Sequence, residues 1–264
     1  MKKRFNYKAA FWILLSLVIL QAIFLIFLVK PRPRPKKALP KAAVPLKGRI
    51  AIVIDDFGYN MNNLALLKTI KQPLTVSVLP NLSYSKAIAE NLHGLGFEVI
   101  LHLPLQPQEK DRLEKDTILT SMDEEAVKAI INRALESIHF ARGVSNHMGS
   151  KATENEKTMN TIFNELKKRR LYFLDSLVSG KSVCRNLAKR IGLSFARRDI
   201  FLDNEQETNY TKQQLYKLKT RARDIGWAIG IGHDRRLTIE VLKEVLPELE
   251  REGFKFVFVS DLVS

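Results

Sequence analysis

Short apolar runs alternate with longer stretches of helical periodicity from residue 48 to the end of the sequence. The apolar runs are rich in β-branched residues and predict buried strands, and the periodic stretches between them predict helices. This alternation is typical of βα units rather than of a sandwich or a helix bundle. The eight expected strands are Arg49 to Asp55, Leu74 to Leu79, Glu98 to Leu103, Gly143 to His147, Leu171 to Leu174, Leu193 to Phe201, Trp227 to Gly232 and Phe254 to Val259.

Two of the expected helices begin with a capping-box spacing, Ser121 with Glu124 and Thr153 with Glu156. There is no internal repeat and no second linker after residue 48, which favours one domain over residues 48–264. Seven or eight βα units favour a closed or partly closed barrel over an open doubly wound sheet. In either architecture, reactive groups gather at the carboxyl ends of the strands.

The N-terminal segment has a different pattern. Ala9 to Val29 is a run of 21 residues without a charge, about the length that crosses ~30 Å of hydrocarbon. A cleaved signal peptide is the alternative, because basic residues precede the run, but the run is longer than the apolar region usual in such peptides. We therefore expect a basic N-terminus (1–8), a transmembrane signal-anchor (9–29), a Pro- and Lys-rich linker (30–47) and the domain (48–264).

This organisation predicts a single-span membrane protein whose domain faces the periplasm or the cell exterior. Basic residues lie on both sides of the span, so the positive-inside rule leaves the orientation open. The net charge of +15 is concentrated before the domain: residues 1–47 hold eleven Lys and Arg and no acidic residue, whereas residues 48–264 hold 32 basic and 28 acidic residues. A domain so nearly balanced lacks the concentrated basic surface of a nucleic-acid-binding protein. Cys184, the only cysteine, is expected to be buried.

Polar residues interrupt the apolar pattern where the expected strands end. These residues are Asp55, Asp56, His102, His147, Asp175 and His233. Singly, each is more often a structural hydrogen-bonding partner or a helix N-cap. Three imidazoles and three carboxylates at corresponding strand ends favour a common site. His93 and His139 instead fall late in helical stretches and are expected to have no chemical role.

Aspartate together with two or three histidines suits Zn²⁺ or a similar divalent ion, with one position left for water. Such an ion lowers the pKa of that water and polarises a carbonyl, while a carboxylate takes the proton and a second acid protonates the leaving group. The sequence contains no Gly-x-Ser-x-Gly elbow and no phosphate-binding loop of the Walker type. Metal-assisted hydrolysis is therefore favoured over serine catalysis.

Six ordered motifs carry a family resemblance that covers essentially the whole domain. They are Ile52 to Gly58, His102 to Pro107, Asn146 to Ser150, Phe173 to Ser176, Arg198 to Asn204 and Ile229 to His233. Together they resemble the divergent polysaccharide deacetylases, relatives of the NodB-type carbohydrate deacetylases. The resemblance implies a distorted (β/α) barrel of seven to eight strands. It also implies a metal-dependent hydrolase that removes acetyl groups from envelope glycans such as peptidoglycan.

The resemblance also implies roles for single residues. Asp55 matches the catalytic base, Asp56 and His102 match metal ligands, and His233 matches the general acid. Asp175 falls where the superfamily keeps an aspartate near the base, and it is taken as a third catalytic residue. The resemblance implies an acetylated, peptidoglycan-like glycan as the substrate, whereas the membrane is expected from the N-terminal apolar helix; protein partners stay open.

One departure leaves a second function open. The NodB-type second motif has another histidine four residues after the first, where this chain has Gln106. His147 is the candidate for the third metal ligand, with zinc the expected ion. A non-catalytic glycan-binding or envelope scaffold protein with a degenerate site is the alternative. Tyr59 and Tyr84 are candidates for stacking on sugar rings.

Overall fold

A computed structural model describes residues 6–29, 45–109 and 112–264. The chain divides into two compact units, Met1–Ala43 and Val44–Ser264, which are described separately. The first contains helix α1, Tyr7–Val29, in which no residue is buried and which is long and apolar enough to cross a membrane. A signal sequence near the N-terminus can meet the same criteria of length and composition. The tip of the basic N-terminus and most of the expected linker lie outside the described residues.

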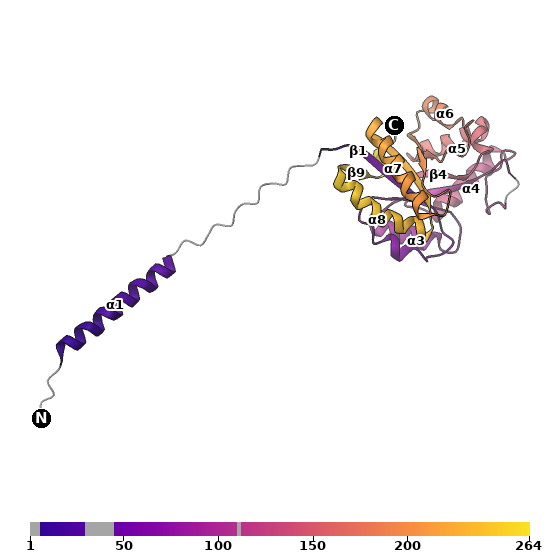
Figure 1. The fold of residues 1–264 in the computed structure, drawn as a ribbon. Coiled ribbons are helices and arrows are strands. Elements are labelled where there is room, and N and C mark those ends of the chain that lie inside the picture. Colours follow the sequence, from indigo (N-terminus) through magenta and orange to yellow (C-terminus); the bar gives the residue numbers. More distant parts are fainter. Residues whose placement is uncertain (1–5, 30–44, 110–111) are drawn as a thin grey trace. The chain divides into compact units, whose positions relative to one another are not determined.

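The second unit is built on one parallel sheet (Figure 1). The strand order is β6-β5-β4-β3-β2-β1-β8-β7, and β9 pairs with the start of β1. The predicted α/β class and distorted barrel are confirmed, in partly closed form. The strands are β1 Gly48–Phe57, β2 Thr75–Val78, β3 Glu98–Leu105, β4 Gly143–Met148, β5 Tyr172–Asp175, β6 Phe195–Arg197, β7 Ile200–Phe201, β8 Trp227–His233 and β9 Phe254–Val257.

The segment between β6 and β7 links the two edges of the partly closed barrel. The single strand expected from Leu193 to Phe201 is wrong, because β6 pairs with β5 whereas β7 pairs with β8 on the other edge. Between them, the Arg198 amide donates to the Asp175 carbonyl at 3.0 Å and the Asp199 amide donates to the Ile229 carbonyl at 2.9 Å. Arg198 and Asp199 thus connect the two edges of the sheet, whose strands do not pair with each other. Local β propensity cannot reveal such a change of partner, since both halves are extended.

Helices lie around the sheet (Figure 1). They are α2 Leu64–Leu67, α3 Ser85–Gly94, α4 Glu124–Ser137, α5 Glu156–Lys168, α6 Cys184–Ile191, α7 Thr208–Ile225 and α8 Arg236–Glu252, with short 3₁₀ turns at Ala152–Glu154 and Val259–Asp261. The N-caps differ from the expected ones. Asp123 accepts the Ala126 amide at 2.8 Å, and Asn155 accepts the Thr158 amide at 2.9 Å. Each N-cap therefore lies two residues after the predicted one, because a better-placed Asp or Asn competes.

Strand residues alternate between two apolar cores because successive side chains point to opposite faces. On β1, Ile50 and Ile52 pack under the helices, whereas Ala51 and Val53 pack inside the barrel. The interior is apolar in its middle and polar at both ends. One polar layer surrounds Glu98, at the amino end of β3, and the other lies at the carboxyl ends of the strands, where the predicted site residues fall.

Candidate metal centre and its proton-transfer groups

A β-bulge at the end of β1 turns two consecutive carboxylates toward the barrel mouth. In a regular strand, Asp55 and Asp56 would point to opposite faces. The register between β1 and β2 instead shifts between Ile54 and Phe57, and Asp56 has a positive φ of 69°. This left-handed conformation is uncommon for a residue other than glycine, and it re-aims the side chain as bulges near active sites often do.

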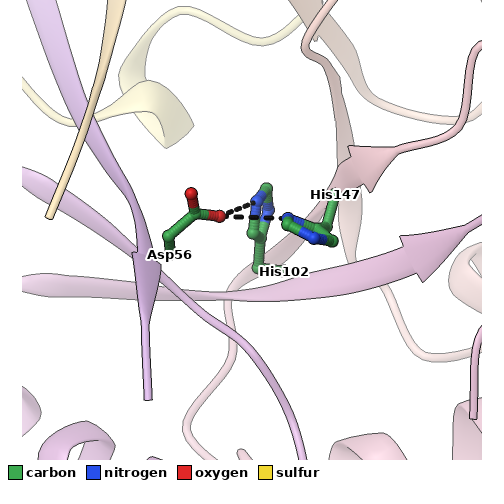
Figure 2. A group of neighbouring side chains, drawn as sticks. All are labelled: Asp56, His102 and His147. Atoms are coloured by element: carbon green, nitrogen blue, oxygen red, sulfur yellow. Dashed lines mark hydrogen bonds and ion pairs between the residues drawn. The ribbon is translucent and has the colours of Figure 1, made fainter. Parts of the chain in front are cut away.

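Asp56, His102 and His147 converge from the ends of β1, β3 and β4 (Figure 2). The Asp56 Oδ1 atom lies 3.2 Å from His102 Nε2 and 3.0 Å from His147 Nδ1. One ligand atom from each residue lies within 4.8 Å of the other two. The three residues predicted as metal ligands are thus brought together, from segments up to 91 positions apart.

The donor set fits a divalent cation. Nitrogen and carboxylate oxygen are the ligands that Zn²⁺ prefers. Burial favours the neutral form of Asp56, but hydrogen bonds from His102 and His147 hold its pKa well below the usual range. Burial also disfavours a charged His102, yet the Asp55 and Asp56 carboxylates raise its pKa. The pocket therefore already stabilises positive charge beside Asp56.

Asp55 is buried next to this trio and is incompletely paired. Its side chain is 2% exposed, and its Oδ1 atom accepts no hydrogen bond. The other oxygen, Oδ2, lies 3.8 Å from His102 Nε2. Burial raises the pKa of Asp55, although the charges of His102 and His233 oppose the rise. A buried oxygen without a partner is costly in a folded protein and points to a role in binding or chemistry.

His233 ends β8 directly beside Asp55, since the two residues are register partners. The Asp203 carboxylate accepts both from His233 Nδ1 at 2.7 Å and from the His233 amide at 2.9 Å. Burial lowers the pKa of His233, but the hydrogen bond and charge of Asp203 outweigh it and raise the pKa. Gly232 leaves room for Thr238, whose hydroxyl also donates to Asp203 at 2.6 Å, because a Cβ at position 232 would lie 2.8 Å from Thr238 Cγ2. The ring is thus held through Nδ1, which leaves Nε2 for chemistry.

Asp175 is not in contact with Asp55 or His233. One of its oxygens accepts the Leu177 amide at 2.8 Å and the other accepts the Ser182 hydroxyl at 2.7 Å. Burial raises its pKa. Both oxygens of this predicted catalytic carboxylate are therefore hydrogen-bonded within the loop that follows β5.

Arg198 lies between that loop and His233. Its guanidinium donates to the carbonyls of Ser176 and Leu177 at 2.6 and 2.9 Å and packs 3.5 Å from the centre of the Phe201 ring. Phe201 in turn stacks on His233. Burial lowers the pKa of Arg198 to about 10, so it remains a cation at neutral pH. Arg198 thus supports the His233 ring through an aromatic stack.

Gln106 does not join the trio. Its Oε1 atom accepts from the amide and the hydroxyl of Thr120 at 2.8 and 2.9 Å. The residue that replaces a family ligand thus ties β3 to the segment before α4. His93 stacks on Phe140, His139 packs against the same ring at a tilt, and Cys184 is buried as a free thiol.

Sequence reasoning assigned no role to Asp203, Arg198, Ser77 or Ser145. Asp203 and Arg198 lie within a motif that carried the family resemblance, but the motif does not say which residue each one contacts. A hollow of about 650 Å³ between α6 and β6, lined in part by Arg185 and Lys189, shares no residue with the trio.

Residues 52–263 match the family described as divergent polysaccharide deacetylase. The chain belongs to this family, which confirms the predicted resemblance. It is 35% identical over 204 residues to the uncharacterized protein YibQ of Escherichia coli (strain K12). That match covers 77% of this chain and 64% of the relative, so the chain spans less than two thirds of that protein.

Solved structures support the same fold. An uncharacterized protein of Agrobacterium tumefaciens C58 superposes with a TM-score of 0.79 at 23% identity, covering 87% of this chain and 92% of that one. A mutant of a CE4 family pseudoenzyme with restored enzymatic activity superposes with a TM-score of 0.52 at 13% identity, covering 83% and 68%. At these identities the likeness shows the fold alone, a NodB-like barrel shared with family 4 carbohydrate esterases.

Proposed function

We propose that this chain is a metal-dependent hydrolase that removes acetyl groups from envelope polysaccharide. One arrangement supports the proposal: a ligand trio of Asp56, His102 and His147 lies beside a buried carboxylate with an unpaired oxygen and a histidine held by Asp203. Family membership adds a carbohydrate as the substrate class. A base, an acid and a cation-binding trio at one rim are the parts that amide hydrolysis needs.

In this proposal Asp56, His102 and His147 hold a divalent ion, which we take to be Zn²⁺. When bound there, such an ion would supply Lewis-acid chemistry, acidifying a water and polarising the acetyl carbonyl. Asp55 takes the proton of the attacking water, since its buried Oδ1 atom has no hydrogen-bond partner. His233 gives a proton to the departing amine, and its raised pKa keeps it protonated at higher pH than an ordinary imidazole.

The remaining site residues position these groups. Arg198 packs on Phe201, which stacks on the His233 ring. Asp175 accepts hydrogen bonds within the loop whose carbonyls accept from Arg198. We therefore assign Asp175 to positioning rather than to proton transfer. Tyr59 follows the end of β1 and is 48% exposed, and its hydroxyl donates to Glu114 at 2.5 Å, so its ring is available at the rim to stack on a sugar.

We further propose that residues 9–29 anchor the protein in a membrane, that residues 30–47 form a linker, and that the domain of residues 48–264 faces the periplasm or the cell exterior. The 23-residue exposed apolar helix supports the anchor. A polysaccharide substrate supports the orientation, because such polymers lie outside the cytoplasmic membrane. A reporter enzyme fused after Ser264 is then active only outside the cytoplasm.

Acetate release tests the activity. The purified protein is incubated with acetylated chitooligosaccharides or peptidoglycan fragments and with added Zn²⁺, Co²⁺ or Mn²⁺, and acetate is measured. We expect metal-dependent release from at least one substrate, abolished by a chelator and restored by metal. If every substrate stays acetylated while glycan still binds, the hydrolase proposal fails.

A glycan-binding scaffold is the second candidate, and one observation favours it. Gln106 lies where the related enzymes have a ligand histidine, and its side-chain oxygen accepts two hydrogen bonds from Thr120. A solved neighbour of the same fold is a pseudoenzyme whose mutant regained activity. Metal content separates the two functions: stoichiometric divalent ion in the purified protein supports the hydrolase, and glycan binding without metal or acetate release supports the scaffold.

A further inference from the structure

Two serine hydroxyls lie directly behind the His102 ring, inside the barrel. Ser145 Oγ is 2.8 Å from His102 Nδ1, and Ser77 Oγ is 2.6 Å from Ser145 Oγ. The serines are fully buried and His102 is 2% exposed. The three residues come from β2, β3 and β4, with His102 and Ser145 directly opposed in the β3–β4 register. The contacts thus lie on the side of the imidazole away from Asp56.

We propose that this hydroxyl pair positions His102 as a metal ligand by holding it as the tautomer that carries its proton on Nδ1, so that the Nε2 lone pair faces Asp56 and the ion. This inference rests on the proposed function, since it assigns the pair a role toward the same ion. Ligand histidines commonly donate their other ring N–H to a fixed partner, which sets the ring orientation and raises ligand basicity. Here the partner is a neutral hydroxyl rather than a carboxylate.

Asp55 determines which of the two serine hydroxyls donates and which accepts. A carboxylate only accepts hydrogen bonds, and Asp55 lies near enough to the Ser77 hydroxyl for that hydroxyl to help hold its negative charge, without a hydrogen bond between them. With its proton directed toward Asp55, Ser77 is left to accept from Ser145. Ser145 in turn is left to accept from His102 Nδ1. The chain of donors therefore runs from the metal-ligand histidine toward the carboxylate proposed as the base.

Metal affinity tests the proposal. The full chain in detergent is titrated with Zn²⁺ against a chromophoric chelator. We expect Ser145→Ala to bind Zn²⁺ about 10- to 100-fold more weakly, the usual effect of losing such a partner. Ser77→Ala has a smaller effect, because Ser145 keeps its contact with the ring. Thr75→Val is the matched control: it removes a buried hydroxyl from the same strand, but one that bonds Glu98, and we expect unchanged affinity.

A second measurement reports the tautomer itself. With ¹⁵N-labelled histidine, the zinc-loaded wild type should show His102 protonated on Nδ1, and Ser145→Ala should show a shifted or mixed signal. Unchanged affinity and an unchanged signal in Ser145→Ala would overturn the proposal and leave the proposed function standing. If Ser145→Ala does not fold, Ser77→Ala decides, and an affinity equal to that of Thr75→Val overturns it. A wild type that binds no divalent ion overturns the proposed function and this inference with it.

Discussion

Glu98 and Asp55 are buried carboxylates at opposite ends of one barrel, 6% and 2% exposed. Glu98 lies at the amino end of β3, where its Oε1 atom accepts from the Thr75 hydroxyl at 2.8 Å, the Tyr172 hydroxyl at 3.0 Å and the Ser260 amide at 3.3 Å. Asp55 lies at the carboxyl end of β1 with Oδ1 unpaired. Burial therefore does not distinguish the two residues, but hydrogen bonding does.

The difference separates a structural group from a chemical one. A buried carboxylate oxygen that accepts three hydrogen bonds joins the elements that bond it, here β2, β5 and the C-terminal 3₁₀ turn. A buried carboxylate oxygen without a hydrogen-bond partner lowers stability unless a ligand or a proton supplies the missing interaction. Both ends of the barrel are polar, yet the unsatisfied oxygen and the convergent ligand atoms coincide at the carboxyl end.

The strongest way to break this comparison is to neutralise each carboxylate in turn. Asp55→Asn should keep the fold and the metal yet lose about 10² to 10⁴ in the rate of acetate release, because the general base is gone. Glu98→Gln is the matched control and should release acetate at the wild-type rate in its folded form. Equal rates for Asp55→Asn and wild type would contradict the role of Asp55.

Substitutions should weaken metal binding only at the carboxyl end of the barrel, where Asp55 lies. His147→Ala removes one of three proposed ligands and should weaken Zn²⁺ binding by more than the roughly 10- to 100-fold that follows loss of a supporting partner. His139→Ala makes the same substitution beside Phe140, away from the trio, and should bind as the wild type does. Chelator competition measures both affinities. Unaltered binding by His147→Ala would remove that residue from the site.

Stability should show the opposite order. Glu98→Ala leaves the Thr75 and Tyr172 hydroxyls without their acceptor and should lower the free energy of unfolding by roughly 1–3 kcal/mol for each group left unsatisfied. Asp55→Asn should cost less in the metal-free protein, since Oδ1 has no hydrogen bond to lose. Denaturant unfolding without added metal gives both values. A larger loss in Asp55→Asn would show that Asp55 is chiefly structural.

A smaller effect concerns the pH dependence of the rate. His233 must be protonated to act as an acid, so activity falls as pH rises through its pKa, which Asp203 raises above the ordinary value of 6.5. Asp203→Asn removes that charge and should move the alkaline limb of kcat/KM to lower pH by about one unit, within the spread seen for histidines in proteins. Asp55 and Asp56 still act on the ring. Asp199→Asn, whose carboxylate bonds the Ile229 amide, should leave the limb unmoved.

Much of this architecture follows from local patterns. The strand and helix positions were predictable because a period of two or 3.6 residues reflects backbone geometry and needs no partner. That His102 and His147 share a rim with Asp55 was predictable as well, since parallel strands of a barrel end at one face. The N-caps were placed two residues too early, where several capping residues compete within a few positions.

The contacts that distinguish one end of the barrel from the other depend on strand pairing. Whether Asp56 turns inward depends on a bulge against β2, and whether Asp203 reaches His233 depends on how β7 pairs with β8. These partners lie tens of residues apart, so no local period specifies their register. Composition and periodicity therefore decide that polar groups gather at the barrel mouth. Only the assembled sheet decides which oxygen is left unpaired there and which ring nitrogen is held, because both are properties of strands brought together across the fold.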